Sequence, residues 1–222
     1  MADRWATFDC YGTLIDWEGG LRSAFEALWP EADADRLLSL HHTVEPRVQE
    51  HAELSYREVL ARCLAAVAAI EDLTLPEGRE NALAESLPSW PPFPEVPASL
   101  AELRERGWRL AILSNTDPDL LAASIEAIGV PIDVAITARE AGSYKPAPGH
   151  WERFFADTGA DRERHVHVGA SLFHDIEAAK RMDMPAVWIN RLGESSDVPR
   201  AAELPDLGGL PDALDQELGV RA

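Results

Sequence analysis

Residues 5–16 have the sequence Trp-Ala-Thr-Phe-Asp-Cys-Tyr-Gly-Thr-Leu-Ile-Asp, and the rest of the architecture can be worked out from them. The apolar run from Trp5 to Phe8 has the length and composition of a short buried strand. It leads directly into a loop that contains Asp9 and Gly12. A strand that ends in such a loop is a common location for chemistry in α/β folds. The stretch therefore predicts a first β-strand with a reactive loop at its carboxyl end.

Beyond this loop the hydrophobic pattern becomes helical. From Trp17 to about Leu87 apolar residues recur at helical spacing, and no segment has the pattern of a good strand. The spacing predicts four helices, at residues 20–29, 33–51, 55–70 and 76–87. Ser55 and Glu58 form a capping-box pattern at the start of the third helix. Residues 17–87 are therefore predicted to be a helical insertion.

A proline-rich segment marks the return from the insertion. Five prolines fall within residues 88–97, and such a segment cannot continue a helix. After it, short apolar strands are expected at residues 109–113, 134–137, 165–168 and 186–189. They alternate with helices expected at residues 118–128, 148–158, 172–182 and 211–218. This alternation predicts an α/β fold with a parallel sheet covered on both faces. The expected core is residues 1–16 and 88–222.

The composition indicates an acidic globular protein. The chain has 222 residues, and 20 Lys and Arg against 39 Asp and Glu give a formal charge of −19. Such a surface repels nucleic acid and anionic lipid, so neither is expected as a partner. Cys10 and Cys63 do not make a disulfide framework. No apolar run reaches the ~18 residues of a membrane span, and no signal-peptide pattern precedes the first strand. We expect a cytoplasmic protein with a small-molecule substrate, and a homodimer stays open.

Chemically active side chains follow four of the predicted strands. Asp9 follows the first strand, and Ser114 and Asn115 follow the second. Lys145 lies in the loop after the third strand, and Asp175 lies in the segment after the fourth. Because the carboxyl ends of the strands of an open parallel sheet converge on one crevice, we expect these side chains to lie together.

Each of these side chains suits a step of nucleophilic catalysis. A carboxylate such as Asp9 can act as a nucleophile if it is positioned and the developing charge is stabilised. Lys145 can orient Asp9 and hold it ionised. Ser114 and Asn115 can donate to an oxyanion or a leaving group, and Asp175 can orient Lys145 or activate a water. Taken alone, each residue is also an ordinary turn or helix-cap residue, so the hypothesis depends on their conjunction.

With these residues identified, the sequence resembles the haloacid dehalogenase superfamily. Residues 8–16 resemble its first motif, Leu113-Ser114-Asn115 its second, Tyr144-Lys145-Pro146 its third and residues 168–175 its fourth. The resemblance spans nearly the whole chain. It implies a Rossmann-like, doubly wound parallel sheet with an inserted helical cap, which residues 17–87 match. It also implies an aspartyl ester or aspartyl phosphate formed by Asp9, with Thr13 in the same catalytic loop.

Residues near the nucleophile resemble one branch of this superfamily. Phosphatases of the superfamily usually have a second aspartate two residues after the nucleophile, where this chain has Tyr11. Ala170 stands where the first acidic residue of a Mg²⁺-binding motif is expected, and Asp9 with Asp175 would make a poor Mg²⁺ site. Halide needs no proton to leave. The sequence is therefore most similar to the type II 2-haloacid dehalogenases, which use no metal or other cofactor.

Positions that contact the substrate depart from that branch. Its members hold the substrate carboxylate with a cap arginine, but residues 37–43 contain none, which leaves Arg36 and Arg47 as substitutes. The fourth motif has Ala170-Ser171-Leu172 in place of a sequence like Ser-Ser-Asn. The residues expected to bind the substrate are Tyr11, Trp17, Asn115 and His174.

Three functions are compatible with these residues. The favoured one is a metal-independent hydrolase that releases halide. The second is a small-molecule phosphatase with Mg²⁺ bound by Asp9 and Asp175. The third is a binding protein that keeps the fold without the chemistry. Halide release with and without EDTA separates the first two, and a covalent adduct on Asp9 would eliminate the third.

Overall fold

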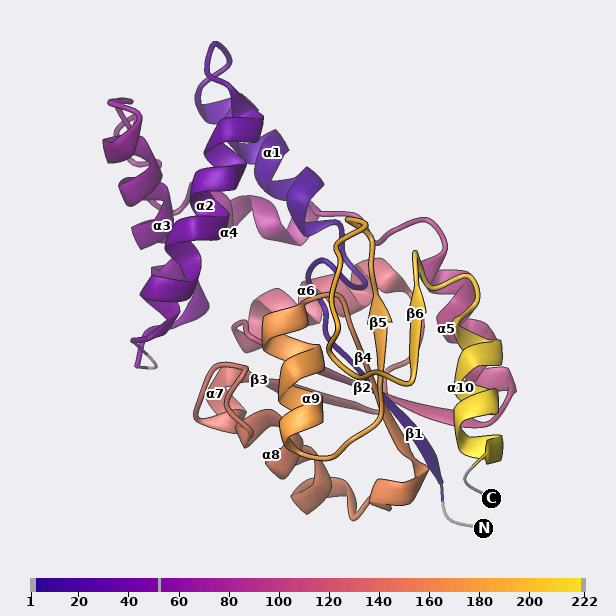
Figure 1. Ribbon diagram of the computed structural model, residues 1–222. Coiled ribbons are helices and arrows are strands. Elements are labelled where there is room, and N and C mark those ends of the chain that lie inside the picture. Colours follow the sequence, from indigo (N-terminus) through magenta and orange to yellow (C-terminus); the bar gives the residue numbers. More distant parts are fainter. Residues whose placement is uncertain (1–2, 52, 221–222) are drawn as a thin grey trace.

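A parallel β-sheet lies at the centre of the protein (Figure 1). The computed structural model describes residues 3–51 and 53–220, and this part of the chain contains a sheet of six strands. Their order across the sheet is β3 (Val134–Thr137), β2 (Trp108–Ser114), β1 (Arg4–Phe8), β4 (His165–Gly169), β5 (Ala186–Ile189) and β6 (Ala202–Leu204). The strand order reverses between β1 and β4, so the crevice at their carboxyl ends is the expected ligand site of such a sheet.

Helices cover both faces of the sheet, as the buried, nearly continuous apolar strands require. One face packs against α5 (Val96–Glu105), α6 (Pro118–Ile128) and α10 (Leu210–Val220). The other packs against α8 (Gly149–Thr158) and α9 (Glu177–Arg181). A short helix, α7 (Ala138–Ala141), follows β3. The predicted α/β class with a parallel sheet is confirmed.

The predicted helical insertion is present between β1 and α5. It contains α1 (Trp17–Leu28), α2 (Ala34–Gln49), α3 (Tyr56–Ile70) and α4 (Ala82–Ser86). Figure 1 shows these violet and magenta helices as a body beside the sheet, which we call the cap. Side chains of Asp16, Asp33 and Ser55 accept from backbone N–H groups at the starts of α1, α2 and α3, and Ser55 forms the expected capping box with Glu58.

Two segments connect the cap to the sheet, residues 9–16 before α1 and residues 90–95 before α5. These crossing segments are hydrogen-bonded to each other. The backbone N–H of Asp16 donates to the carbonyl of Pro91 at 2.9 Å, and that of Phe93 donates to Leu14 at 3.0 Å. A Cβ atom on Gly20 of α1 would lie 2.3 Å from the Trp90 ring, so the helix requires a glycine there.

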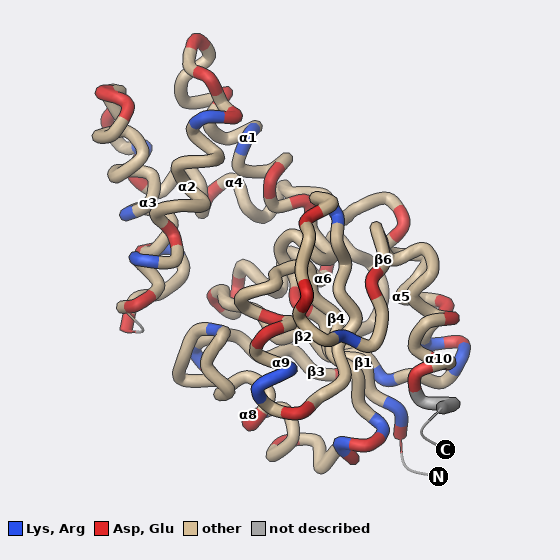
Figure 2. Tube along the Cα trace, viewed as in Figure 1, with Lys and Arg blue, Asp and Glu red and all other residues tan. Residues whose placement is uncertain are grey.

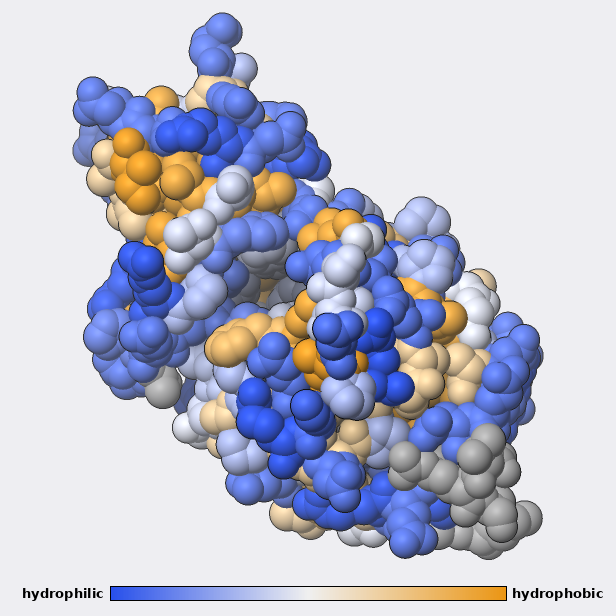
Figure 3. All heavy atoms as spheres, in the orientation of Figure 1, coloured by the Kyte–Doolittle hydropathy of each residue, from blue (hydrophilic) through white to orange (hydrophobic). Residues whose placement is uncertain are grey.

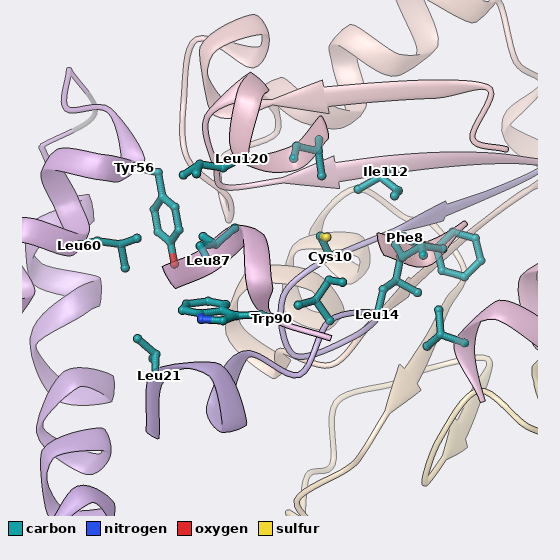
Figure 4. Close-up of a cluster of buried hydrophobic side chains, with 14 of the residues drawn as sticks. Phe8, Cys10, Leu14, Leu21, Tyr56, Leu60, Leu87, Trp90, Ile112 and Leu120 are labelled. Carbon is teal, nitrogen blue, oxygen red and sulfur yellow. The ribbon is translucent and has the colours of Figure 1, made fainter. Parts of the chain in front are cut away.

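One continuous apolar cluster, which we call the cap–core cluster, joins the two bodies (Figure 4). It includes Phe8 and Ile112 of the sheet, Leu14 and Trp90 of the crossing segments, and Leu60 of α3. The cap is thus packed onto the core as well as connected to it.

Several elements differ from the sequence-based expectations. The helix expected at residues 76–87 is shortened to α4 and a 3₁₀ turn (Leu87–Ser89), because residues 76–81, with Gly78 at φ +75°, form turns. The helix expected at residues 172–182 is divided into a π-helical turn (Leu172–Ile176) and α9.

Besides the short helix α7, two further elements were missed by the sequence analysis. Helix α5 begins within the proline-rich segment, because Pro97 lies in its first turn, where no N–H is needed. Strand β6 is a three-residue edge strand. No helix among residues 3–51 and 53–220 is long and apolar enough to cross a membrane.

Candidate active site

Asp9 lies at the carboxyl end of β1, in a tight loop that bends back on itself. Its backbone N–H donates to Val168 of β4 at 2.9 Å, which holds it at the edge shared by the two central strands. Gly12 has φ +85°, a conformation that a side chain would strain, and it allows the loop to return. Asp9 is largely buried, with 9% exposure of the residue and 13% of its side chain. Its Oδ2 accepts from the Thr13 hydroxyl at 2.8 Å.

Lys145 contacts Asp9, as the sequence analysis predicted. Its side chain is buried, at 2% exposure of the residue, and Nζ donates to Asp9 Oδ1 at 2.8 Å and to Asp175 Oδ1 at 2.7 Å. The ammonium therefore lies between two buried carboxylates. An arrangement of this kind fixes all three groups and leaves a net negative charge at the end of the sheet.

Burial and ion pairing oppose each other in these three groups. Burial raises the pKa of Asp9, and the nearby Lys145 ammonium acts against this increase. Burial by itself would lower the pKa of Lys145, but Asp175 and Asp9 outweigh it and hold that pKa above its usual value. Burial would likewise raise the pKa of Asp175, yet Lys145 and His167 hold it well below its usual range. Asp175 is thus the more firmly ionised carboxylate, and Asp9 is the more basic one.

A buried hydrogen-bonded chain extends behind Asp175. His167 Nε2 lies 3.3 Å from Asp175 Oδ1, and its Nδ1 lies 2.9 Å from the Thr7 hydroxyl. The Thr7 hydroxyl is also 2.8 Å from His165 Nε2. Thr7 and His167 face each other because they are register partners in adjacent parallel strands. Thr7 was missed from the sequence, although alternate positions on paired strands point to one face.

Thr13 connects the nucleophile loop to the fourth motif. Besides donating to Asp9, its hydroxyl accepts from the backbone N–H of Ala170 at 2.9 Å. The carbonyl of Ala170 in turn accepts from the Trp188 indole at 2.9 Å. Thr13 thereby fixes the Asp9 carboxylate against a rigid neighbouring strand end.

The two polar residues after β2 have different surroundings. Ser114 is 1% exposed and lines the cavity above Asp9, and its hydroxyl has no hydrogen-bond partner. The Asn115 amide donates to the carbonyl of Lys145 at 3.0 Å and accepts from the N–H of Lys145 at 2.6 Å. The Ser114 hydroxyl therefore keeps its hydrogen-bonding capacity unused, whereas both polar atoms of Asn115 hold the Lys145 backbone.

A cavity of about 680 Å³ lies over these groups, between the cap and the core. Figure 3 shows the surface hollowed between the two bodies. One face of α2 lines its cap side through His42, Glu45, Pro46 and Gln49, which are spaced as neighbours on one helix face. Trp17 and Tyr56 complete this wall. The cavity places the predicted residues Tyr11, Trp17, Asn115 and His174 around Asp9.

Glu45 and Tyr56, which the sequence analysis missed, form a polar pair in the cap wall. The Tyr56 hydroxyl donates to Glu45 Oε1 at 3.0 Å and accepts from the Trp17 indole at 3.3 Å. Burial raises the pKa of Glu45 to about 7. The carboxyl is therefore present in both protonation states near neutral pH.

Tyr11 and His174 both line the cavity. The Tyr11 ring stacks on Tyr56 with ring centres 6.3 Å apart, and its hydroxyl is 3.0 Å from that of Ser124, outside the cavity lining. Burial lowers the pKa of His174, which favours a neutral imidazole, and its Nδ1 lies 3.1 Å from the Ser171 hydroxyl.

The two arginines considered as substitutes for a cap arginine do not line the cavity. Arg36 Nε donates to Glu71 at 2.8 Å on the outside of the cap, and Arg47 is exposed on α2. Arg191, on the core side, does line the cavity, but it binds Glu95 at 2.6 Å.

The residues around Asp9 do not fit a divalent cation. A Mg²⁺ site needs about six oxygen ligands. Asp9 and Asp175 both direct Oδ1 to the Lys145 ammonium, and Ala170 offers no side-chain oxygen. Among residues 3–51 and 53–220 no group of three or more His, Cys, Asp or Glu is arranged to hold a metal.

Comparisons with known proteins give one consistent family. A sequence model of the haloacid dehalogenase-like hydrolases matches residues 4–183. Haloacetate dehalogenase H-2 of Moraxella sp. (strain B) is 31% identical over 211 residues, which cover 92% of this chain and 90% of that protein. Phosphoserine phosphatase of Thermus thermophilus is 30% identical and is matched over 83% of this chain and 70% of its own. The crystal structure of the L-2-haloacid dehalogenase RSc1362 has a TM-score of 0.85 and 25% identity, and the match covers 97% of this chain and 100% of that one.

Proposed function

Because the chain belongs to the haloacid dehalogenase-like hydrolases, as its four motifs predicted, we propose that it displaces halide from the α-carbon of a small organic compound. The observation that carries the proposal is the pair of Asp9 and Lys145, 2.8 Å apart at the base of a cavity. At the phosphatase acid position, Tyr11 directs its hydroxyl to Ser124, so the site offers no acid there for an alkoxide leaving group. Relatives named as dehalogenases support the same reaction class.

In the first step an Asp9 carboxylate oxygen attacks the carbon that bears the halogen. A carbon–oxygen bond forms, the carbon–halogen bond breaks, and its electron pair leaves with the halide. Lys145 and Thr13 each bind one carboxylate oxygen, which orients Asp9 before the reaction. The unpaired Ser114 hydroxyl is the donor available to the departing halide or to the substrate.

In the second step water attacks the carbonyl carbon of the Asp9 ester. The bond between that carbon and the ester oxygen breaks, which releases a hydroxylated product, a proton and the Asp9 carboxylate. We assign water activation to the neutral His174 imidazole at the cavity wall. Asp175 orients Lys145 in this proposal, because its Oδ1 is bound to both Lys145 and His167.

The other residues that were predicted at the site position the catalytic groups and the substrate in this proposal. Asn115 holds the Lys145 backbone, and Tyr11 and Trp17 form apolar walls beside the reacting carbon. We propose that residues 17–87 form the cap and that residues 1–16 and 88–222 form the catalytic core.

The donor set around Asp9 also supports a reaction without a metal or other cofactor. Cys10 and Cys63 are free and buried, which supports a cytoplasmic location. Acidic residues are spread along both cap and core in Figure 2, which argues against nucleic acid and anionic membranes as partners. A homodimer stays an expectation that light scattering would test.

Isotope labelling tests the proposal directly. With enzyme in excess over a halogenated substrate in H₂¹⁸O, the first product should contain unlabelled oxygen from Asp9, and the label should appear in the Asp9 carboxylate. Halide release should be equal with EDTA and with millimolar Mg²⁺, and Asp9→Asn should abolish it. Direct entry of ¹⁸O into the first product, or Mg²⁺-dependent turnover of phosphate esters alone, would refute the proposal.

A further inference from the structure

The wall of the active-site cavity is acidic. Among the described residues that line it, there are six carboxyl side chains and two arginine or lysine side chains, so its formal charge is −4 when every carboxyl, Glu45 included, is counted as ionised and the histidines as neutral. The carboxylates are Asp9, Asp16, Glu18, Glu45, Asp175 and Glu194. A wall of this charge repels an anion that approaches the nucleophile.

Both cations in this wall are already paired. Lys145 lies 2.8 Å from Asp9 and 2.7 Å from Asp175. Arg191 binds Glu95 at 2.6 Å and the carbonyl of Thr13 at 2.8 Å, and its guanidinium lies 3.6 Å from the centre of the Phe93 ring. Within the described part of the lining, therefore, no lysine or arginine is left to hold a substrate carboxylate.

The polar groups that face the cavity match a neutral amide better than an anion. Glu45 can accept from an N–H group at the cap end of the cavity, beside the Tyr56 hydroxyl that it already binds. Ser114, which is 1% exposed and unpaired, can donate to a carbonyl oxygen at the core end. An amide offers both a donor and an acceptor to such a pair.

Two exposed apolar side chains are part of the cavity lining. Phe173 is 51% exposed and Leu192 is 63% exposed, and both line the cavity on its core side. A volume of about 680 Å³ lies in the range of pockets that hold drug-sized ligands. The cavity thus has room for an apolar substituent on the reacting carbon.

We propose that this cavity selects an uncharged organohalogen, a 2-halocarboxamide with an apolar substituent, over the corresponding 2-halocarboxylate. The selection rests on the halide-displacing function proposed above. The adjacent carbonyl activates the halogen-bearing carbon toward Asp9 as a carboxylate group would, without bringing a second negative charge into the acidic wall. The product is the 2-hydroxycarboxamide, with release of halide and a proton.

A matched substrate pair tests this selection. Halide release from 2-bromohexanamide and 2-bromohexanoate is measured on the wild-type protein, after subtraction of the uncatalysed rates. We expect kcat/KM for the amide to exceed that for the acid by about tenfold or more. An equal or higher kcat/KM for the acid would overturn the selection while leaving halide displacement in place.

Charge-removing variants on α2 locate the selection. Glu45→Gln keeps an acceptor for Tyr56 but removes the charge, and it should shift the amide-to-acid ratio toward the acid by about tenfold. Glu50→Gln removes the same charge from an exposed position at the end of the same helix, outside the cavity lining, and should leave the ratio unchanged. An unchanged ratio in Glu45→Gln, or an equal shift in both variants, would contradict the assignment to Glu45.

Binding of unreactive analogues separates this inference from the proposed function. Hexanamide should bind the wild-type protein more tightly than hexanoate, as measured by NMR titration. If neither bromo compound releases halide and no Asp9 ester forms, the halide-displacing function fails, and tighter hexanamide binding would still support the selection. Tighter or equal binding of hexanoate would overturn the selection regardless of turnover.

Discussion

Replacing Lys145 by methionine removes the ammonium that separates two buried carboxylates. Nζ lies 2.8 Å from Asp9 Oδ1 and 2.7 Å from Asp175 Oδ1. With an effective dielectric constant of about 20, each contact corresponds to roughly 6 kcal/mol of Coulomb attraction, before the cost of desolvation. Removing one partner of a buried ion pair typically costs about 3–5 kcal/mol. We expect Lys145→Met to lower the free energy of unfolding at pH 7 by this amount and to abolish halide release.

The loss of stability in this variant should depend on pH. Without Lys145, one carboxylate of the Asp9 and Asp175 pair takes up a proton in the folded state, so its folded-state pKa rises above the unfolded value. The stability contributed by such a group is fully present below the unfolded pKa and is lost as pH rises through the folded pKa. The difference in unfolding free energy between wild type and Lys145→Met should therefore become smaller toward pH 5 and larger toward pH 8.

Urea unfolding followed by tryptophan fluorescence between pH 5 and pH 8 measures this effect. Lys180 is the other of the two lysines of the chain and is exposed on α9, so Lys180→Met is a matched control that should stay within about 0.5 kcal/mol of wild type. The ion-pair reasoning would be refuted if the unfolding free energy of Lys145→Met at pH 7 lay within about 1 kcal/mol of the wild-type value. It would also be refuted if the loss of unfolding free energy did not depend on pH.

Three further outcomes are expected. Thr13→Val removes the donor to Asp9 and the acceptor of the Ala170 N–H, so it should lower kcat and cost about 1–3 kcal/mol of unfolding free energy, whereas Thr13→Ser should restore both. Gly20→Ala places a Cβ 2.3 Å from the Trp90 ring and should cost about 1–3 kcal/mol in urea unfolding. Because burial raises the pKa of Asp9 and attack needs the carboxylate, kcat/KM should fall with decreasing pH at a midpoint above that of an ordinary aspartate. A midpoint at or below that value would contradict this.

The neighbourhood of Asp9 could be predicted from the sequence because of the sheet. Parallel strands direct their carboxyl ends to one edge, so residues that follow separate strands meet there regardless of loop length. Lys145 contacts both Asp9 and Asp175 for this reason. The strand order does not determine that Asn115 turns to the Lys145 backbone, because that depends on the conformation of two loops.

The cap wall could not be predicted in the same way. His42, Glu45 and Gln49 form a polar stripe on α2, and a polar stripe on a helix ordinarily faces solvent. Here it faces the cavity because of the way the insertion packs on the sheet, which no local pattern specifies. The proline-rich segment was misjudged for a local reason, since a helix tolerates proline in its first turn, where α5 has Pro97.

The cap–core cluster runs without a break from Phe8 in β1 through Leu14 to Leu60 in α3 (Figure 4). Swinging the insertion outward as a rigid body would bring this shared apolar interior into water. Heating should consequently melt insertion and sheet together, in a single calorimetric peak. It also follows that substrate entry and product release depend on rotation of side chains at the rim of the cavity, such as Phe173, more than on displacement of whole helices.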